Sequence, residues 1–247
     1  DNPELVDVHD IICKENDEIE IVLNYETTGD KEKFRSSMVR IHAMENSKVT
    51  VYLISMDGKE TTSYESIYAK LEENANINLY EYRLGASKVV SNTKADVKGD
   101  FSNFNIDSIY FGYGNDDLDI DYDLIHYGKE SKSDLMVNGA LKDNATKLFK
   151  STLDFKQGSK KSNGSEEEYV ILLSDDVHSQ SVPVLLSGED DIAGNHAASA
   201  GKLDMDIIFY LMSRGLTREE AESLVINTRF ASAIDSLKDE KHKEAIW

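Results

Sequence analysis

The sequence predicts an all-β core of the β-solenoid type followed by C-terminal α-helices. Short β-type runs, separated by Asn, Asp, Gly and Ser, fill most of the chain up to Ala198 without a competing helical period. Several runs share a weak sequence repeat in which a small or polar residue precedes a β-branched one, as in Asn74–Ile77 and Lys94–Val97. The repeat recurs about every 17 to 25 residues. We therefore expect a β-helix core domain at 1–202 and a C-terminal helical segment at 203–247.

The expected strands begin with one edge strand between Asp1 and about Arg40, where Glu18–Tyr25 alternates polar and apolar residues. A two-sheet sandwich would give strands of similar length but usually more Asn-Gly and Asp-Gly hairpin turns. The composition of Gly158–Glu168 predicts a mobile loop. The later strands are expected at Val49–Ile54, Ser63–Leu71, Ala75–Tyr82, Lys88–Val97, Phe101–Phe111, Leu118–Tyr127, Asp134–Val137, Leu148–Phe155, Tyr169–Leu173, Val182–Leu186 and Asp191–Ala198.

Two helices with clear end signals are predicted near the C-terminus. Asp204 is placed to cap a helix over Met205–Ser213, and Gly215 stands where a left-handed residue would end it. Thr217 and Glu220 form a capping box that opens a second helix. The second helix carries an apolar stripe, which we expect to face a partner, made of Ala221, Leu224, Val225, Thr228, Ala231, Ile234 and Leu237.

Charge and composition exclude several classes of function. The formal net charge is −20, and such a surface repels the phosphate backbone of nucleic acids. A hydrophobic content of 40% is too high for a disordered acidic chain. No apolar stretch approaches the length of a membrane span, and no basic and apolar leader is seen. The single cysteine, Cys13, excludes an internal disulfide, and we expect a cytoplasmic protein.

Residue types alone point to no catalytic centre. Asp119, Asp121 and Asp123 would share one strand face, but the spacing lacks the glycine and glutamate of an EF-hand, which favours a solvated face. The histidines at 126, 178 and 196 have no Ser–His–Asp or metal-binding spacing around them, so a structural role is the simpler interpretation of each. Cys13 is most simply a small buried hydrophobe.

The region from about Tyr122 to Ile234 resembles the core domain of the SufB/SufD family, scaffold proteins of the Suf iron–sulfur cluster assembly system. The segment from His196 to Asp204 is similar to the family element His-Gly-Ala-Thr-Val-Gly-x-Leu/Ile-Asp, with Ala197 in place of the glycine. Phe209–Thr217 is close to the element Phe-Tyr-x-x-Ser-Arg-Gly-Leu/Ile. Further matches are Leu172–Ser174, Pro183–Leu185 and Ile125–His126.

The resemblance implies a fold, partners and site residues. The fold would be a right-handed parallel β-helix with flanking helices, and the protein would not be an enzyme. The partners would be a SufB-type paralogue, or a second copy of the chain, and a SufC-type ATPase docked on Asp204–Ser213 and Arg218–Lys238. His196 would be a possible ligand of iron or of a cluster at the subunit interface. The partner-binding residues would be Phe209, Tyr210, Ser213, Arg214, Gly215, Glu220, Ala221 and Leu224.

One departure from the family pattern favours a SufD-like role. In the register set by Pro183, a cysteine of the SufB branch falls at Val177, which is not a thiol. We therefore expect no cofactor bound stably by this chain alone, and at most a transient iron–sulfur cluster at a subunit interface. The family's N-terminal helical domain is missing, which indicates a minimal member or a fragment. Two alternatives remain: a sole homodimeric SufB/SufD-type scaffold, and a carbohydrate-active β-helix protein such as a polysaccharide lyase.

Overall fold

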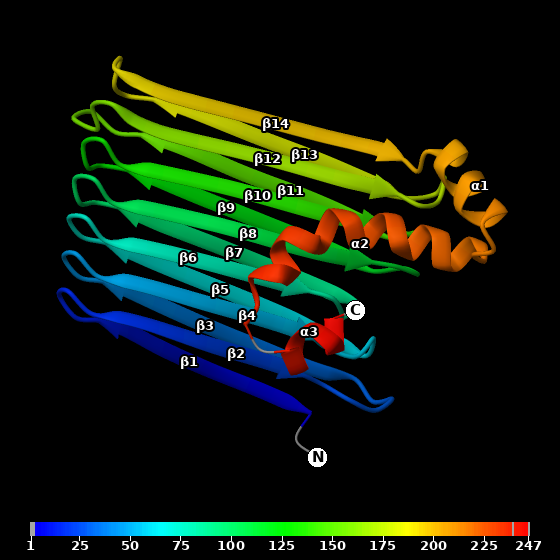
Figure 1. Ribbon diagram of the computed structural model, residues 1–247. Coiled ribbons are helices and arrows are strands. Elements are labelled where there is room, and N and C mark those ends of the chain that lie inside the picture. Colours follow the sequence, from blue (N-terminus) through cyan, green and yellow to red (C-terminus); the bar gives the residue numbers. More distant parts are fainter. Residues whose placement is uncertain (1–2, 239, 247) are drawn as a thin grey trace.

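The computed structural model describes residues 3–238 and 240–246, and it is a two-layered ladder of strands with helices against one side (Figure 1). Within these residues, fourteen strands alternate between two seven-stranded sheets, the odd-numbered strands in one and the even-numbered strands in the other. Neighbouring strands pair in parallel, which confirms the predicted β-solenoid with C-terminal helices. The strands are β1 (Glu4–Cys13), β2 (Glu18–Glu26), β3 (Lys33–Ala43), β4 (Lys48–Met56), β5 (Thr61–Leu71), β6 (Asn76–Arg83), β7 (Lys88–Val97), β8 (Asn103–Gly112), β9 (Asp117–His126), β10 (Lys132–Leu141), β11 (Thr146–Phe155), β12 (Ser162–Leu172), β13 (His178–Ser187) and β14 (Ile192–Lys202). The helices are α1 (Met205–Ser213), α2 (Arg218–Ser236) and α3 (Glu240–Ile246).

Each coil supplies one strand to each sheet, so stacked residues lie 26 positions apart between Thr62 and Lys88 and 32 apart between Thr146 and His178. Each coil of the solenoid is thus longer than the repeat of about 17 to 25 residues expected from the sequence. The single edge strand expected up to Arg40 is wrong, because this region forms β1, β2 and most of β3. The expected loop at Gly158–Glu168 is also wrong beyond residue 161, where β12 begins.

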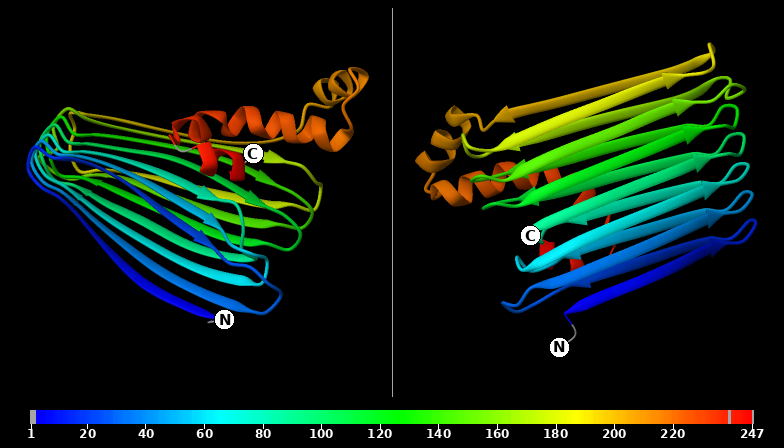
Figure 2. Two further views of the ribbon diagram at one scale, coloured as in Figure 1. Left: turned by 60° about the horizontal axis from the view of Figure 1, so that its bottom comes forward. Right: turned by 180° about the vertical axis from the view of Figure 1, so that it is seen from behind.

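The corner between each odd strand and the next even strand is built in the same way in successive coils. A non-glycine residue there has a φ between 52° and 62°, in the left-handed region. Its backbone N–H donates to a carbonyl of the next coil, as Asn46 does to Glu73 at 2.9 Å. The corners therefore stack on one another along the solenoid (Figure 2). The left-handed residues are Asn16, Asn46, Asn74, Phe101, Glu130 and Lys161.

The space between the two sheets is filled by side chains that alternate with outward-facing ones along each strand. Like residues stack from coil to coil, as in the buried row Ile41, Ala69, Ala95, Leu124 and Leu153 of the odd-numbered sheet. Removing this hydrocarbon from water stabilises the fold by about 25 cal/mol per Å². Each coil therefore covers the inner face of its neighbour.

The interior also contains a chain of buried charges. Arg35 contacts Glu65 at 2.6 Å and Asp57 at 2.7 Å, and Arg83 contacts Glu65 at 2.9 Å and Glu81 at 2.8 Å. Tyr122 donates to Glu81 as well. Although burial opposes ionisation, Arg83 and Arg35 hold the pKa of Glu65 at about 2. The network links strands from β3 to β9 through their side chains.

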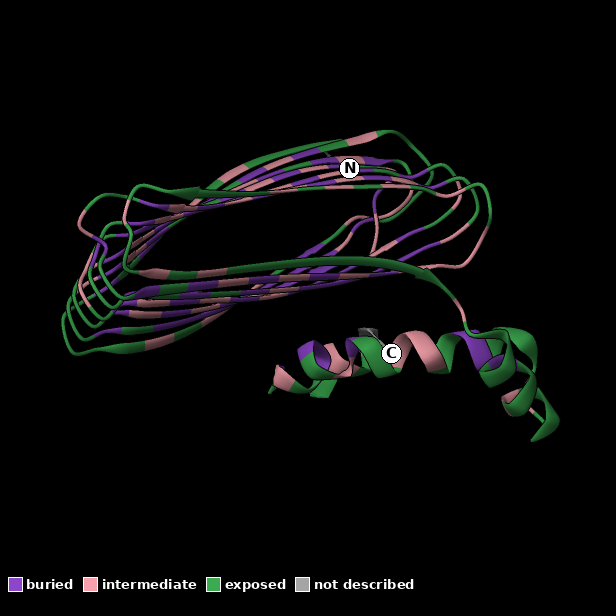
Figure 3. Ribbon diagram, turned by 90° about the horizontal axis from the view of Figure 1, so that it is seen from above, coloured by how far each residue is buried: buried purple, intermediate pink, exposed green. Residues whose placement is uncertain are grey.

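Helix α2 lies along the outer face of the even-numbered sheet (Figure 3). The capping box of Thr217 and Glu220 is present as predicted, and Gly215 has a φ of 102° after α1. The helix ends at Ser236, two residues before the expected Lys238. The end of α2 packs on the chain's own sheet, so Ile234 and Leu237 of the predicted stripe face that sheet and not a partner, whereas Leu224 and Thr228 are exposed. The cluster comprises Phe230, Ala233, Ile234 and Leu237 with Tyr52, Ile54, Tyr82, Ile109 and Ala140. None of the described helices combines the length and apolar character needed to span a bilayer.

Candidate functional site at the open end of the solenoid

The last coil leaves an edge of each sheet without a neighbour in the described chain. Strands β13 and β14 end the two strand orders, and most of their residues are exposed. An edge strand presents free N–H and C=O groups that can pair with another chain. Small residues occupy the inner face of β14 at Gly194, Ala198 and Ala200, so this end is open to an approaching surface.

His196 lies on β14 at this open end and is exposed. The ladder pairs it directly with Glu166 on β12, so both side chains leave the sheet on its inner face. Glu166 is 1% exposed, and its Oε1 accepts a hydrogen bond from Ser151 on β11. Burial raises the pKa of the Glu166 carboxyl, while the Ser151 hydrogen bond and the positive form of His196 oppose the shift.

A second acidic side chain on the same face of β12 is fully paired. Glu168 Oε1 accepts from Lys147 at 2.6 Å and from Tyr110 at 3.1 Å, and its Oε2 accepts from Ser181 on β13. Burial lowers the pKa of Lys147, and the charge of Glu168 opposes this. The two carboxylates thus differ in their partners. Glu168 forms an ion pair with Lys147, whereas Glu166 accepts a hydrogen bond from the neutral hydroxyl of Ser151.

The predicted histidines are not brought together. His126 is fully buried between Ser131 and Ser133, with contacts of 2.7 and 2.8 Å, and burial lowers its pKa to about 4. It is a neutral structural group. His178 begins β13 on the outside of the opposite sheet, away from the inner row of His196. Across the described residues, no group of three or more His, Cys, Asp or Glu side chains is arranged to hold a metal.

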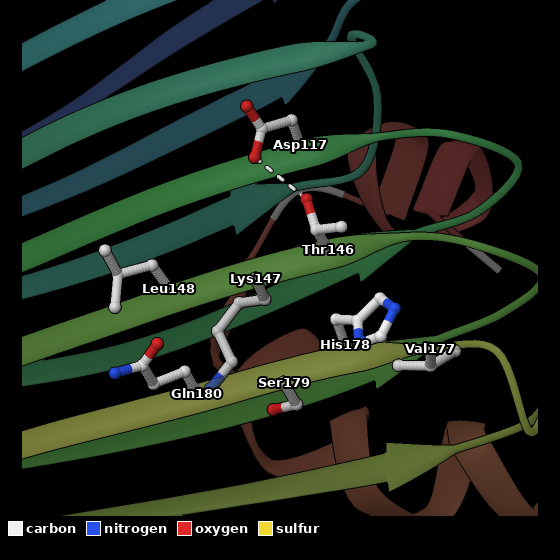
Figure 4. Close-up of a pocket in the computed structure, with 8 residues that line it drawn as sticks. All are labelled: Asp117, Thr146, Lys147, Leu148, Val177, His178, Ser179 and Gln180. Carbon is white, nitrogen blue, oxygen red and sulfur yellow. Dashed lines mark hydrogen bonds between the residues drawn. The ribbon is translucent and has the colours of Figure 1, made fainter.

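A pocket of about 500 Å³ lies where β9, β11 and β13 begin (Figure 4). Asp117, Thr146 and His178 form one row across these strands, and the Thr146 hydroxyl donates to Asp117 at 2.9 Å. Val177 lines the same pocket and packs against the core through its hydrocarbon side chain. Cys13 is buried on β1, in the first coil. The open end therefore has nitrogen and oxygen donors but no thiol.

The expected partner-binding residues divide into exposed and internal ones. Phe209 is 61% exposed and Tyr210 57% exposed on α1, and Leu224 on α2 is also exposed. Ala221 is buried, and Glu220 is engaged in the capping box. The remaining three stand exposed at the end of α1 and just beyond it; they are Ser213, Arg214 and Gly215.

Sequence reasoning missed Glu166, Glu168 and Lys147. The two glutamates were absorbed into an acidic, glycine-containing stretch that predicts a loop. A signal was present, because Glu166, Glu168 and Val170 alternate with outward residues at the period of a strand. Acidic side chains rarely point into a protein interior, so the acidic composition of this stretch favoured a loop over a strand.

Comparison with known proteins gives consistent results along almost the whole chain. A family model described as "SUF system FeS cluster assembly, SufBD core domain" matches residues 2–229. "Iron-sulfur cluster assembly protein SufD" of Bacillus subtilis (strain 168) is 27% identical over 240 residues, covering 96% of this chain and 54% of that protein. The protein of the same name from Escherichia coli (strain K12) is 21% identical over 238 residues, covering 96% and 56%. The chain spans about half the length of these relatives.

Proposed function

The chain belongs to the SufBD core-domain family of the SUF iron–sulfur cluster assembly system, and from this membership we propose a non-catalytic scaffold that pairs with a SufB-type subunit and docks a SufC-type ATPase. The cluster under assembly would be cargo held transiently at the subunit interface, in the cytoplasm. The observation that carries the proposal is the open end of the solenoid, where two unpaired strand edges surround the exposed His196.

Pairing through this end uses the ordinary chemistry of strand edges. β13 and β14 offer main-chain donors and acceptors, and β13 also supplies hydrocarbon to bury through its exposed apolar residues, Val182, Val184, Leu185 and Leu186. A second solenoid with a similar edge would continue both sheets. The small residues at Ala198 and Ala200 leave room for its side chains.

We assign docking of the ATPase chiefly to α1, because the C-terminal part of α2 packs on the chain's own sheet. Helix α1 buries Ile208 and leaves a broad apolar surface exposed. A cluster of this kind on one short helix is typical of a protein-binding surface. Its exposed apolar residues are Met205, Ile207, Phe209, Tyr210 and Met212.

A second candidate function is a sole homodimeric scaffold of a minimal system. The open end carries the imidazole of His196 and the carboxylate of Glu166 in place of thiols, and two copies would bring four such donors together. Co-expression separates the two candidates. The first requires a complex with a cysteine-bearing SufB-type chain, whereas the second requires a dimer in its absence.

The test is anaerobic co-expression with SufB-type and SufC-type proteins, followed by size exclusion and an absorption spectrum. Phe209→Glu should abolish retention of the ATPase, because it places a charge on the apolar surface of α1, yet leave pairing unchanged. Ala200→Lys should abolish pairing, with Ala197→Lys on the other face of β14 as its control. A chain that elutes alone and colourless from every mixture would refute the scaffold proposal.

A further inference from the structure

The outer face of the first three strands of the odd-numbered sheet carries large apolar side chains that are exposed. They alternate with inward residues along each strand, and Met38, for example, lies between the buried Ser37 and Val39 on β3. Within the described residues, the helices lie against the other sheet (Figure 3). We call these side chains, which are 38% to 71% exposed, the apolar face; they are Val6, Val8, Phe34, Met38 and Tyr64.

The members of the apolar face are neighbours on the strand ladder. Val8 pairs with Met38 across β1 and β3. The ring centroids of Phe34 on β3 and Tyr64 on β5 are 5.6 Å apart. The same face of β9 presents the aspartates of 117–123 instead, as expected of a sheet face in water. The apolar face is therefore a local feature of the first three coils, and contiguous exposed patches of this kind mark binding surfaces.

A pocket of about 550 Å³ with an acidic rim lies at the start of these strands, and the aromatic pair of the apolar face lines it. Glu32 and Glu60 stand in successive coils just before β3 and β5, and Glu4 begins β1; all three are exposed. Lys33 also lines the pocket, but its ammonium group donates to the backbone carbonyl of Thr28 at 2.5 Å. Aromatic rings beside carboxylates attract a cationic side chain through both the ring faces and the negative charge.

We propose that the apolar face and its acidic pocket bind a basic amphipathic helix of a partner protein. The apolar stripe of that helix covers Val8, Met38 and Tyr64, and one of its lysine or arginine side chains enters the pocket between Glu32 and Glu60. This surface lies apart from both the open end of the solenoid and α1, so the inference does not depend on the function proposed above.

The dimensions of the face favour a helix over a strand. Its side chains come from three strands that are about 4.8 Å apart, which gives a width of about 10 Å, the diameter of a helix. A strand added to the edge of β1 would contact that strand alone. The even-numbered sheet already accepts a helix on its outer face, where Phe230 and Ile234 of α2 pack.

The charge of the chain favours a basic partner over a second copy. The net charge is −20, so two copies repel each other. In a two-fold interface the same surface meets itself, and the carboxylates of Glu32 and Glu60 would face their own counterparts. A helix with lysine or arginine beside its apolar stripe meets the same carboxylates with the opposite charge.

The test uses a fluorescein-labelled helical peptide of about 18 residues, five turns of helix, with leucine on one face and lysine on the other. Its twin carries glutamate in place of each lysine. Fluorescence anisotropy with the full chain at low ionic strength should give saturable binding of the lysine peptide, and none of the glutamate peptide. Added salt should weaken the binding, because it screens the exposed carboxylates.

Two aromatic substitutions test the apolar contact. Phe34→Ala and Tyr64→Ala should each weaken binding by about tenfold, because an aromatic side chain at the centre of an interface contributes at least this much. Tyr127→Ala is the matched control. Tyr127 has the same exposed fraction as Tyr64, 41%, but it lies beyond the far end of β9, so its loss should leave binding unchanged.

A pair of charge reversals tests the acidic rim. Glu32→Lys combined with Glu60→Lys should abolish binding of the lysine peptide. The control combines Glu45→Lys with Glu73→Lys, which make the same change in net charge at exposed positions beyond the other ends of β3 and β5. The control protein should retain most of the affinity, because its acidic pocket is intact.

The outcomes decide between this surface and its alternatives. Binding that needs the aromatic pair and the two pocket glutamates supports the proposal. Equal losses from the two charge reversals would show a general attraction to an acidic protein and overturn it, as would a lysine peptide that fails to bind. Sedimentation that shows self-association of the parent chain, abolished by Phe34→Ala, would assign the face to a second copy and overturn the proposal too. Circular dichroism of each variant excludes unfolding as the cause of a loss.

Discussion

Arg83 shows how single residues hold the charged interior together. Its guanidinium lies between the carboxylates of Glu65 and Glu81, and the three side chains are at most 2% exposed. Ser91, Ser108 and Tyr122 accept from the remaining N–H groups at 2.7, 3.3 and 3.2 Å. Such a network stabilises the fold only while it is complete, because each charge was moved out of water to make it.

Arg83→Met should therefore destabilise the protein by about 3 to 5 kcal/mol, since it leaves the buried carboxylate of Glu81 without its cation and that of Glu65 with Arg35 alone. Urea unfolding followed by circular dichroism measures the change. Arg40→Met is the matched control: Arg40 pairs with Asp10 on the exposed surface, where water screens the charges, so its loss should change the free energy of unfolding far less. If both substitutions lowered the free energy of unfolding equally, burial would not be what makes the Arg83 ion pairs important for stability.

Residues of this kind could not be identified from the sequence. The chain has 47 acidic residues, and composition cannot say which of them turn inward. His196 was identified through the similarity of its surrounding segment to a family element. Glu166 required the register between β12 and β14, a contact between positions 30 residues apart that no local pattern encodes.

At the scale of elements, the contact between α2 and the even-numbered sheet contains one poorly solvated acid. Asp107 on β8 lies beneath the helix, where Ser232 is its hydrogen-bonding neighbour. Burial raises the pKa of Asp107 to about 6, and the charge of Asp134 adds to the shift. Between about pH 4 and 6 the folded protein thus keeps a proton that the unfolded chain has released.

This group makes the unfolding free energy fall as the pH rises through that window, after which its contribution is constant. Asp107→Asn removes the ionisation and should stabilise the protein at pH 7.5 by about 2 kcal/mol. The gain should shrink towards zero as the pH is lowered to about 3, where the parent carboxyl is mostly protonated in both states. Urea titrations of both proteins across this range test the prediction. A gain independent of pH would show that packing, and not charge, is responsible.

Element boundaries could be predicted where local chemistry sets them. Asp204, Thr217 with Glu220, and Gly215 act within one helical turn, and the helix starts agree with the prediction. The corners of the later coils lack the usual signal of a glycine or asparagine. Phe101, Glu130 and Lys161 take the left-handed conformation without being glycine, and the hydrogen bond to the next coil stabilises them there.

At the scale of the whole molecule, solenoids commonly behave as chains of repeats that contact only their neighbours. Here the side chains of Arg35, Glu65, Arg83, Glu81 and Tyr122 join β3 to β9 in one network. If one strand of this network separates from the others, a buried charge on a neighbouring strand loses its ion-pair partner. Coil-by-coil unfolding is therefore disfavoured.

We expect a single unfolding transition, with circular dichroism and tyrosine fluorescence giving the same midpoint in urea. Tyr122 reports on the network, and Tyr52 and Tyr82 report on the contact with α2. In the Arg83→Met protein the two signals should separate, because the link between coils is lost. Separate midpoints in the parent protein would show that the coils act independently.

The charged interior also restricts how the length of this solenoid can change. In a wholly apolar solenoid, a coil can be lost or duplicated because every coil offers the same surface to its neighbours. Deleting residues 61–83 here would remove Glu65, Glu81 and Arg83 together, leaving Arg35 facing a sequence that was never matched to it. The interior thus ties the number and order of the middle coils together, and a coil could be added or lost without breaking this network only towards the two ends, one of which carries His196.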